Sequence, residues 1–273
     1  MKKKLFFTAV ILFAALFAVS AFFLIRYYVQ TGRSQKAYNE LTQIKMQALE
    51  EAPSEAYDPE TGELLPPALL EITDPNTGQT RLILPEYAPI YLMNPDTVGW
   101  IKVEGTNIDY PVLQRTDSKD YYLNRDFYGK WNSQGAIYAR EQCDVSAPSD
   151  NVTVYGHNMK SGTMFAGLHK YNTKEFWQEH QYIQLDSLTE RRTYQVMAVF
   201  SIDSTLESDF PYHLFVDAQE EQEFVDFVAQ AKRYSLYDTG VTAQPGDKLI
   251  TLSTCTGVNN VNRFVVVAKL VEE

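Results

Sequence analysis

The sequence predicts a mainly β fold with added helices, an α+β class, in which about eight strands form a barrel or a sandwich. From residue 85 of the 273-residue chain onward, short runs rich in Val, Ile, Tyr and Phe alternate with Gly, Pro, Asn and Asp. That alternation is typical of many short strands joined by turns. A long amphipathic segment interrupts the runs late in the chain, which places one helix between the last strands.

The expected strands are rich in β-branched and aromatic residues, which favour extended structure. The last one contains Phe264-Val265-Val266-Val267-Ala268, which is apolar on both faces and suits a central strand covered on both sides. The eight strands are expected at residues 98–103, 107–112, 135–139, 152–155, 182–186, 193–202, 248–253 and 264–271.

The clearest expected helix covers about residues 218–234. Its apolar positions, from Phe224 to Ala231, fall on one face, and Asp217 precedes it as the expected N-cap. Shorter helical segments are expected at residues 118–123, 163–169 and 173–180.

The first 26 residues have the composition of a membrane anchor. Three lysines at residues 2–4 precede an uncharged apolar run at residues 5–25, which Arg26 closes. This run reaches roughly 30 Å as a helix, the thickness of a bilayer's hydrocarbon core. We expect residues 1–4 in the cytoplasm, residues 5–25 across the cell membrane as a single pass, and the rest outside the cell. A signal peptide cleaved after residues 19–21 is the alternative.

Residues 26–84 are expected to form a stalk helix and a proline-broken linker ahead of a globular domain at residues 85–273. Leu41, Ile44 and Ala48 have helical spacing, whereas the prolines between residues 53 and 85 exclude a long helix there. The linker contains Asp-Pro-Xaa-Thr-Gly twice, at residues 58–62 and 74–78. Both repeats are expected to form tight turns, because Pro and Gly suit successive turn positions.

The composition excludes several functional classes. The chain is 45% hydrophobic and has a formal net charge of −11, so it can bury a core and has no electrostatic reason to bind nucleic acid. Its two cysteines and four histidines lack HxxxH, HExxH and CxxC spacing, so no metal site is expected. The sequence also lacks Walker A, GxGxxG and GxSxG motifs, and no cofactor is expected.

Cys255 is the candidate nucleophile. It ends the apolar run Thr251-Leu252-Ser253-Thr254-Cys255, so a strand can present its sulfur to a cleft. From the residues alone, two alternatives stay open. Cys255 can be a buried core residue, because a free cysteine behaves as a small hydrophobe, or it can form a disulfide with Cys143.

His157 is the histidine best placed to carry protons, because it also follows an apolar β run. His169 and His180 belong to amphipathic helical segments, where surface or packing roles are expected. Arg263, eight residues beyond the cysteine, is the candidate for holding negative charge.

These segments together resemble the class B sortases, the membrane-anchored cysteine transpeptidases of Gram-positive bacteria. Residues 251–255 are similar to the TLxTC nucleophile strand of that family, and residues 263–266 to the strand that begins with its catalytic arginine. Residues 155–165 resemble the YGHNM…MF segment around its histidine. The resemblance also includes residues 98–101 and 108–112 and covers roughly residues 90–271. It implies an eight-stranded sortase-type β-barrel with N-terminal helices and one long helix between late strands.

The resemblance also implies a reaction and its partners. Cys255 would cleave an NPxTx or xPxTG sorting motif through a thioester, His157 would move protons, and Arg263 would hold the oxyanion or orient the peptide. The substrates would be surface proteins with C-terminal sorting motifs, and the acceptor an amine of peptidoglycan precursor or of a pilin. Substrate-binding roles are expected for Ser253, Thr254, Tyr155, Leu123 and Tyr212.

One departure from the family leaves substrate choice open. Residues 257–260, Gly-Val-Asn-Asn, replace the aromatic and acidic pair of many class B members and lean toward the pilus-building class C pattern. The alternatives to a sortase are a non-catalytic anchored surface module, in which Cys143 pairs with Cys255, and a cysteine peptidase that hydrolyses wall peptides. A further hypothesis places one Pro-Xaa-Thr-Gly repeat in the cleft as a pseudo-substrate.

Overall fold

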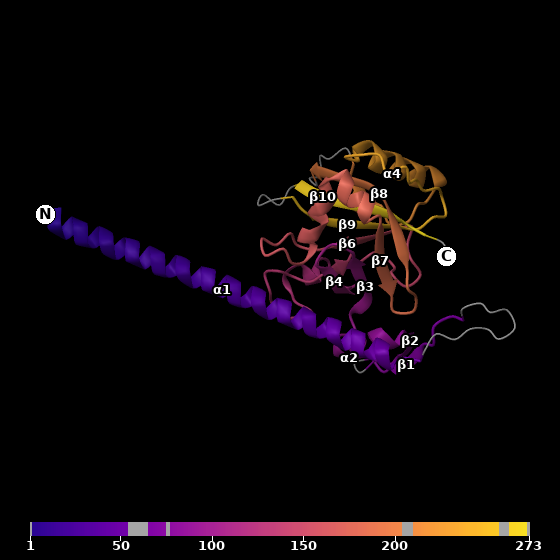
Figure 1. Cartoon of the computed structure of the whole chain (residues 1–273), viewed down its shortest axis with the longest axis horizontal. Helices are drawn as coiled ribbons and strands as arrows, with labels where there is room; N and C mark the ends of the chain where they lie inside the picture. The colour runs from indigo at the N-terminus through magenta and orange to yellow at the C-terminus, as the bar shows by residue number, and fades with distance from the viewer. Residues whose placement is uncertain (1, 54–64, 75–76, 204–209, 257–261, 272–273) are drawn as a thin grey trace. The chain divides into compact units, whose positions relative to one another are not determined.

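The computed structural model describes residues 2–53, 65–74, 77–203, 210–256 and 262–271 (Figure 1). The chain divides into a first unit, residues 1–40, and a second unit, residues 41–273. The helix α1 (Lys2–Glu51) begins in the first unit and ends in the second.

The first unit is helical and apolar. A stretch of α1 with a mean hydropathy of 2.6 is long enough to cross a membrane, which makes it a candidate membrane anchor. Its aromatic side chains are exposed, with Phe6, Phe13 and Phe17 at 66%, 73% and 77%. Large exposed apolar side chains of this kind indicate a surface that is covered by something other than water.

The second unit contains a closed barrel of eight strands, as the sequence predicts, and not a sandwich. The strand order around the barrel is β10-β8-β7-β3-β4-β5-β6-β9. Neighbouring strands are antiparallel except for two parallel pairs, β4–β5 and β6–β9. The strands are β3 (Thr97–Val103), β4 (Ile108–Leu113), β5 (Tyr138–Ala139), β6 (Asn151–Tyr155), β7 (Tyr182–Ser187), β8 (Thr193–Asp203), β9 (Leu249–Cys255) and β10 (Asn262–Leu270).

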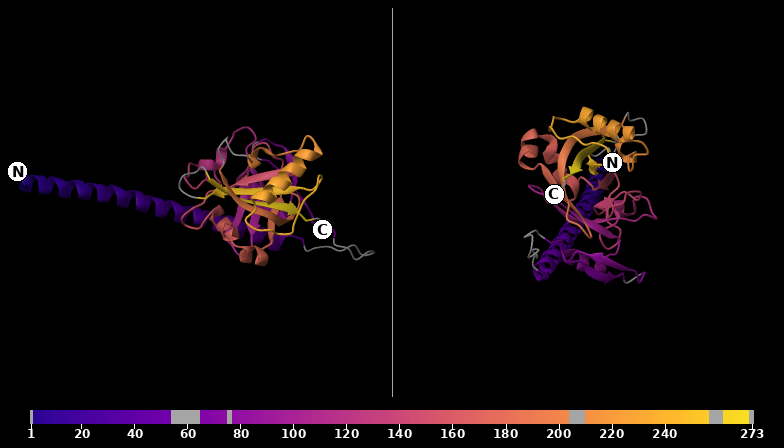
Figure 2. Two further views of the ribbon diagram at one scale, coloured as in Figure 1. Left: turned by 90° about the horizontal axis from the view of Figure 1, so that it is seen from above. Right: turned by 90° about the vertical axis from the view of Figure 1, so that its right-hand side faces the viewer.

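The strand β10 is central, as its two apolar faces predict. It pairs with β8 on one side and with β9 on the other. Val265 and Val267 pack into an apolar cluster with Phe224 and Phe227 of the helix α4 (Glu221–Tyr234). The helix α4 therefore covers the outer face of the barrel, which both views of Figure 2 show.

The prediction that Asp217 caps α4 was wrong. The N-cap residue is Glu220, which makes no side-chain capping bond. The Asp217 carboxylate instead accepts hydrogen bonds from the Asp150 N–H, at 2.9 Å, and from the Ser149 hydroxyl, at 3.2 Å. A tertiary contact has replaced the local cap, because Asp217 lies beside the loop that leads into β6.

The shorter helices lie near their expected places, although several are 3-10 helices. The helix α3 (Lys174–Glu179) has Thr173 as its N-cap, whose hydroxyl accepts from the Phe176 N–H. The strand β5 is shorter than expected, because Gly135 adopts a left-handed φ of +60° in a turn. The remaining helices are α2 (Ala88–Met93), η1 (Pro85–Tyr87), η2 (Tyr121–Asn124), η3 (Phe165–Asn172) and η4 (Tyr212–Leu214).

The described residues of the second repeat, Asp74, Thr77 and Gly78, lie between the paired strands β1 (Leu70–Thr73) and β2 (Thr80–Ile83). Gly78 has a φ of +72°, and its N–H donates to the Asp74 carbonyl at 2.9 Å. The Asp74 carboxylate also accepts from the Tyr91 hydroxyl of α2, at 3.1 Å. The described part of this repeat therefore has the expected turn role, whereas the first repeat and residues 75–76 lie outside the described residues.

The last turns of α1, within the second unit, pack on the barrel. Leu41 is fully buried, and Lys45 Nζ contacts Asp109 Oδ1 of β4 at 3.2 Å. The same ammonium lies 4.2 Å from the ring centre of Trp100 on β3, a cation–π contact. That residues 26–84 as a whole form a stalk helix and a linker stays a prediction.

Candidate active site

Three strand ends meet at one edge of the barrel and bring the predicted site residues together. The strands β6 and β9 are parallel, so the segments that follow them leave the barrel on the same side. The cysteine ends β9, and His157 lies two residues beyond the end of β6. Because β10 runs antiparallel to β9, its second residue, Arg263, is the register partner of Cys255.

The sulfur of Cys255 contacts the arginine directly. Arg263 Nη1 lies 3.4 Å from Cys255 Sγ, and both side chains are partly buried. Cys143 is buried separately, where its thiol approaches the Asn151 carbonyl at 3.5 Å and burial raises its pKa to about 11. Both cysteines are free. The disulfide between Cys143 and Cys255, on which the non-catalytic alternative depended, is therefore absent.

His157 is oriented by the backbone of a neighbouring loop. Its Nε2 lies 2.8 Å from the Leu123 carbonyl oxygen. A carbonyl can only accept, so Nε2 carries a hydrogen and Nδ1 is the ring nitrogen left for other partners. Gly156 precedes the histidine at a crowded point, since a Cβ there would meet Ile137 at 2.5 Å and Phe165 at 2.7 Å. Any side chain at residue 156 would therefore force Ile137 and Phe165 to shift beside His157.

A cleft of about 530 Å³ contains all eight residues that the sequence singled out. Leu123 and Tyr155 lie on its lining with His157, and Tyr212 lies there with the end of β9. Seventeen residues line it among those described, and the predicted ones are Leu123, Tyr155, His157, Tyr212, Ser253, Thr254, Cys255 and Arg263. No described residue of the second Pro-Xaa-Thr-Gly repeat is on this lining.

The two hydroxyl residues before the cysteine differ in their bonding. Ser253 Oγ pairs with the Tyr212 hydroxyl at 2.8 Å. Burial, the main cause, raises the pKa of Tyr212 to about 12. Thr254 is 2% exposed, and its hydroxyl has no hydrogen-bond partner among the described residues. An unpaired buried hydroxyl is costly, and this oxygen is itself shielded from solvent, so Thr254 can bond to a ligand only if the cleft lining moves to expose it.

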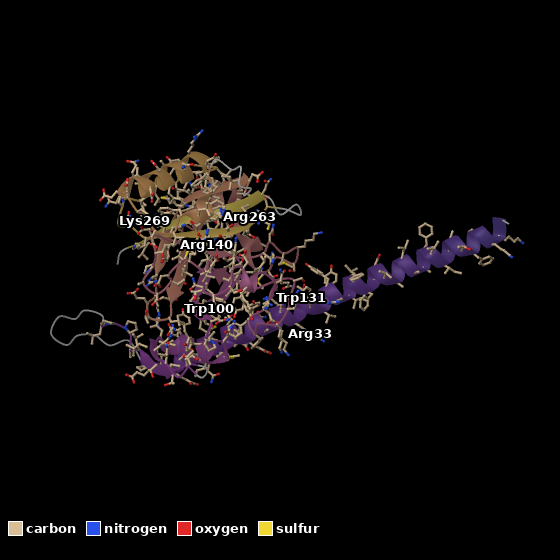
Figure 3. The ribbon with its side chains drawn as sticks, turned by 180° about the vertical axis from the view of Figure 1, so that it is seen from behind. Arg33, Trp100, Trp131, Arg140, Arg263 and Lys269 are labelled. Atoms are coloured by element: carbon tan, nitrogen blue, oxygen red, sulfur yellow. The ribbon has the colours of Figure 1, made fainter. Side chains whose placement is uncertain are left out.

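The sequence did not identify a group of cations in the cleft. Lys119 and Arg140 line it together with Arg263, and Figure 3 labels both arginines. Burial first, and then these three cations, lower the pKa of His213, which borders the same cleft. Asp120 lines the same cleft, and its carboxylate accepts a hydrogen bond from the Tyr138 hydroxyl at 3.0 Å. Arg140 directly follows β5, so only the barrel register reveals its position.

The rest of the described structure contains a second cavity but no group of metal-binding side chains. A second cavity, of about 640 Å³, is polar and lies elsewhere on the barrel, near Lys269 and Thr239. Within the described ranges, no group of three His, Cys, Asp or Glu side chains is placed to hold a metal ion. The departure at residues 257–260 lies outside the described residues.

Comparison with known proteins assigns the family. The sortase domain model matches residues 101–271. Sortase B of Staphylococcus aureus is 32% identical over 192 residues, which cover 70% of this chain and 76% of that protein. Sortase B of Listeria monocytogenes is 33% identical over 188 residues, covering 68% and 74%. A solved structure described as a Staphylococcus aureus sortase B–substrate complex superposes with a TM-score of 0.72, at 24% identity, covering 89% of this chain and 99% of that one.

The family match and the two sortase B relatives, on a closed barrel with a cysteine at a strand end, place the chain among the cysteine transpeptidases. The chain belongs to the sortase family, with relatives of class B.

Proposed function

We propose that Cys255, His157 and Arg263 are the catalytic residues of this transpeptidase. The observation that supports the proposal best is the 3.4 Å contact between Arg263 Nη1 and Cys255 Sγ, in a cleft that also contains His157. A guanidinium beside the sulfur provides a fixed positive charge for a thiolate and, later, for an oxyanion. A nucleophile, a proton carrier and an anion-binding group are thus within one cleft.

In the first half-reaction, the Cys255 thiolate attacks the carbonyl carbon of the Thr in the sorting motif. The tetrahedral intermediate places negative charge on the former carbonyl oxygen, which Arg263 stabilises. Its collapse breaks the peptide bond after Thr and leaves an acyl thioester on Cys255. His157 protonates the departing amine, and the proton comes from Nδ1 because Nε2 donates to the Leu123 carbonyl.

In the second half-reaction, an incoming primary amine attacks the thioester carbonyl. Neutral His157 takes the surplus proton from that amine at Nδ1, which regenerates the imidazolium. The second tetrahedral intermediate expels the Cys255 thiolate and leaves a new amide bond. Arg263 holds the same negative charge in both steps, so its removal would slow both.

The substrates we propose are surface proteins with a C-terminal NPxTx or xPxTG motif. Leu123 and Tyr155 provide an apolar wall, and Thr254 adds a hydroxyl without a partner among the described residues, which a peptide backbone group reaches only when the lining moves. The related Staphylococcus aureus structure is described as a substrate complex. The acceptor is an amine of peptidoglycan precursor or of a pilin.

The apolar helix supports a location at the cell membrane. We propose that residues 5–25 cross it once, with residues 1–4 in the cytoplasm and the barrel outside the cell. This orientation places the cleft where sorting signals and wall precursors are exposed.

The test uses one peptide that satisfies both motif patterns, Asn-Pro-Ala-Thr-Gly with a fluorophore and a quencher at its ends. The wild-type chain should cleave it after Thr, and mass spectrometry should detect the acyl intermediate on Cys255. Cys255→Ala should abolish both signals and keep the circular dichroism of the fold. Acylation at Cys143 in the wild type would contradict the proposal.

Added triglycine separates transfer from hydrolysis. It presents an unhindered primary amine, so a transpeptidase should yield the amide product in proportion to the triglycine concentration. A product mixture that stays entirely hydrolysed at every triglycine concentration would favour the peptidase alternative for this acceptor.

A further inference from the structure

The carbonyl of Cys255 lies beyond the last residue of β9 that pairs with β6. The pairing of β6 with β9 ends at Tyr155 and Ser253, and the next bond on that side joins the Gly156 N–H to the Ser253 carbonyl at 3.2 Å. Two residues further on, the Cys255 carbonyl points to the same side of β9. The backbone after Gly156 is no longer in register with β9, so within the described ranges the ladder offers this carbonyl no N–H group.

Two side chains replace that missing N–H. Asn158 Nδ2 lies 3.0 Å from the Cys255 carbonyl oxygen, and His169 Nε2 lies 3.1 Å from the same oxygen. The two nitrogens are themselves 3.1 Å apart. With Nε2 protonated, the carbonyl accepts two hydrogen bonds. In the other tautomer Asn158 donates to the carbonyl and to Nε2. Either way the carbonyl is held.

A bent segment between His157 and His169 brings His169 to the Cys255 carbonyl. Met164 has a φ of +55°, an uncommon conformation for a non-glycine residue. Its N–H donates to the Tyr110 hydroxyl at 3.2 Å, and the Phe165 N–H donates to the His157 carbonyl at 3.0 Å. The helix η3 follows at once and carries His169.

The imidazole of His169 is also supported from β10. It stacks on Phe264, with ring centres 4.6 Å apart and planes at 30°. Phe264 is the neighbour of Arg263, so the His169 ring contacts both strands that carry the site. The sequence predicts only a surface or packing role for His169.

We propose that Asn158 and His169 are positioning residues, which together clamp the Cys255 carbonyl and so fix the sulfur relative to His157 and Arg263. The proposal rests on the function proposed above. Asn158 directly follows His157, so its bond ties the histidine loop to the cysteine strand. Holding the carbonyl fixes the peptide plane after Cys255, and thereby the direction in which its side chain leaves β9.

The test measures kcat and KM for transfer from Asn-Pro-Ala-Thr-Gly to triglycine, with the full chain in detergent. Asn158→Ala and His169→Leu should each lower kcat and leave KM near the wild-type value. The double variant should lose about 100-fold in kcat, the effect expected from a displaced reacting group. His169→Gln should recover most of the loss, because its amide nitrogen can again donate to the carbonyl.

The matched control is His180→Leu. His180 also packs its ring on a phenylalanine, Phe176, with ring centres 4.4 Å apart, but the side chains that bond to the Cys255 carbonyl are Asn158 and His169. This variant should keep the wild-type kcat. A double variant with wild-type kcat would overturn the proposal, and so would a folded His169→Gln protein as slow as His169→Leu. The proposal would also be overturned if kcat fell only in proportion to a lower unfolding temperature of the variants.

A second readout does not depend on the sorting reaction. Iodoacetamide at pH 7 reaches Cys255 without any peptide subsite, and the double variant should be alkylated more slowly because the sulfur is no longer held toward the cleft beside Arg263. Unchanged alkylation would overturn the clamp. A wild-type chain that is alkylated at Cys255 but forms no acyl intermediate would instead contradict the proposed function.

Discussion

At the scale of single residues, the site depends on charge placed beside a sulfur. Arg263 reaches Cys255 Sγ because antiparallel pairing makes the two residues register partners. Pairing of β9 with β10 is therefore enough to bring the two side chains together. The guanidinium also presents several N–H donors in a planar fork, which suits a group that must hold an oxyanion.

Replacing Arg263 should therefore slow the chemistry without unfolding the protein. We expect Arg263→Ala to lower kcat by about 10²–10³, the usual cost of losing one oxyanion donor. Arg263→Lys should restore little, because an ammonium lacks the planar fork. Steady-state kinetics with the motif peptide measure both, and near-normal transfer by Arg263→Ala would remove this residue from the mechanism.

Thr254 offers a separate test of substrate binding. Its buried hydroxyl has no partner among the described residues, so Thr254→Val should leave the free energy of unfolding unchanged or slightly higher. The same change should raise KM for the motif peptide, because the hydroxyl can no longer bond to it. Urea unfolding and steady-state kinetics give the two values. An unchanged KM would show that the hydroxyl does not bind the peptide.

His213 should make stability depend on pH. Its pKa in the folded protein lies below the ordinary value of 6.5, first because of burial and then because of Arg140, Lys119 and Arg263. The unfolded chain therefore binds a proton more readily, so this contribution is intact above about pH 6.5 and stability falls as the pH drops through the folded-state pKa. His213→Asn should lose less thermal stability than wild type between pH 8 and pH 5. An equal loss in both proteins would contradict the assignment.

At the scale of elements, helix ends and strand ends were the least predictable features. The apolar face of α4 follows from spacing, whereas its start does not. Asp217 has a good capping side chain, yet the loop before β6 binds it instead. The prediction for β5 was too long for a related reason, since Gly135 packs so closely that a Cβ would lie 2.4 Å from the Leu123 carbonyl.

The unused cap of α4 can be improved. Glu220→Ser would place a serine three residues before Glu223, the spacing of a capping box. We expect the free energy of unfolding to rise by about 1 kcal/mol. Thermal or urea unfolding measures the change, with Gln222→Ser, inside the helix, as the control that should not stabilise. A less stable Glu220→Ser protein would show that its present charge at the helix N-terminus matters more.

At the scale of the whole molecule, the apolar helix and the barrel have separable tasks. Deleting residues 1–30 should give a soluble protein that keeps its kcat on short peptides, because the removed part contributes no residue to the cleft. Peptide kinetics in the absence of detergent test this. Loss of activity in a folded, truncated protein would assign the helix a role in catalysis.

N-terminal sequencing of the mature protein decides between anchor and signal peptide. An intact start supports the anchor, whereas a start at Phe22 would mean that the segment is cleaved.

The sequence by itself predicted the eight strands, apart from the length of β5, the apolar face of α4, and Cys255, His157 and Arg263 as candidate site residues. These features are local, because strand alternation, helical spacing and short motifs depend only on residues close together in the sequence. The tertiary structure decided the rest. The strands close into a barrel and not a sandwich, and the two cysteines are free. Lys119 and Arg140 lie on the lining of the cleft. Beyond the end of β6, the Cys255 carbonyl bonds to Asn158 and His169. Each of these depends on pairing between segments distant in sequence, and no local pattern encodes which strands become neighbours.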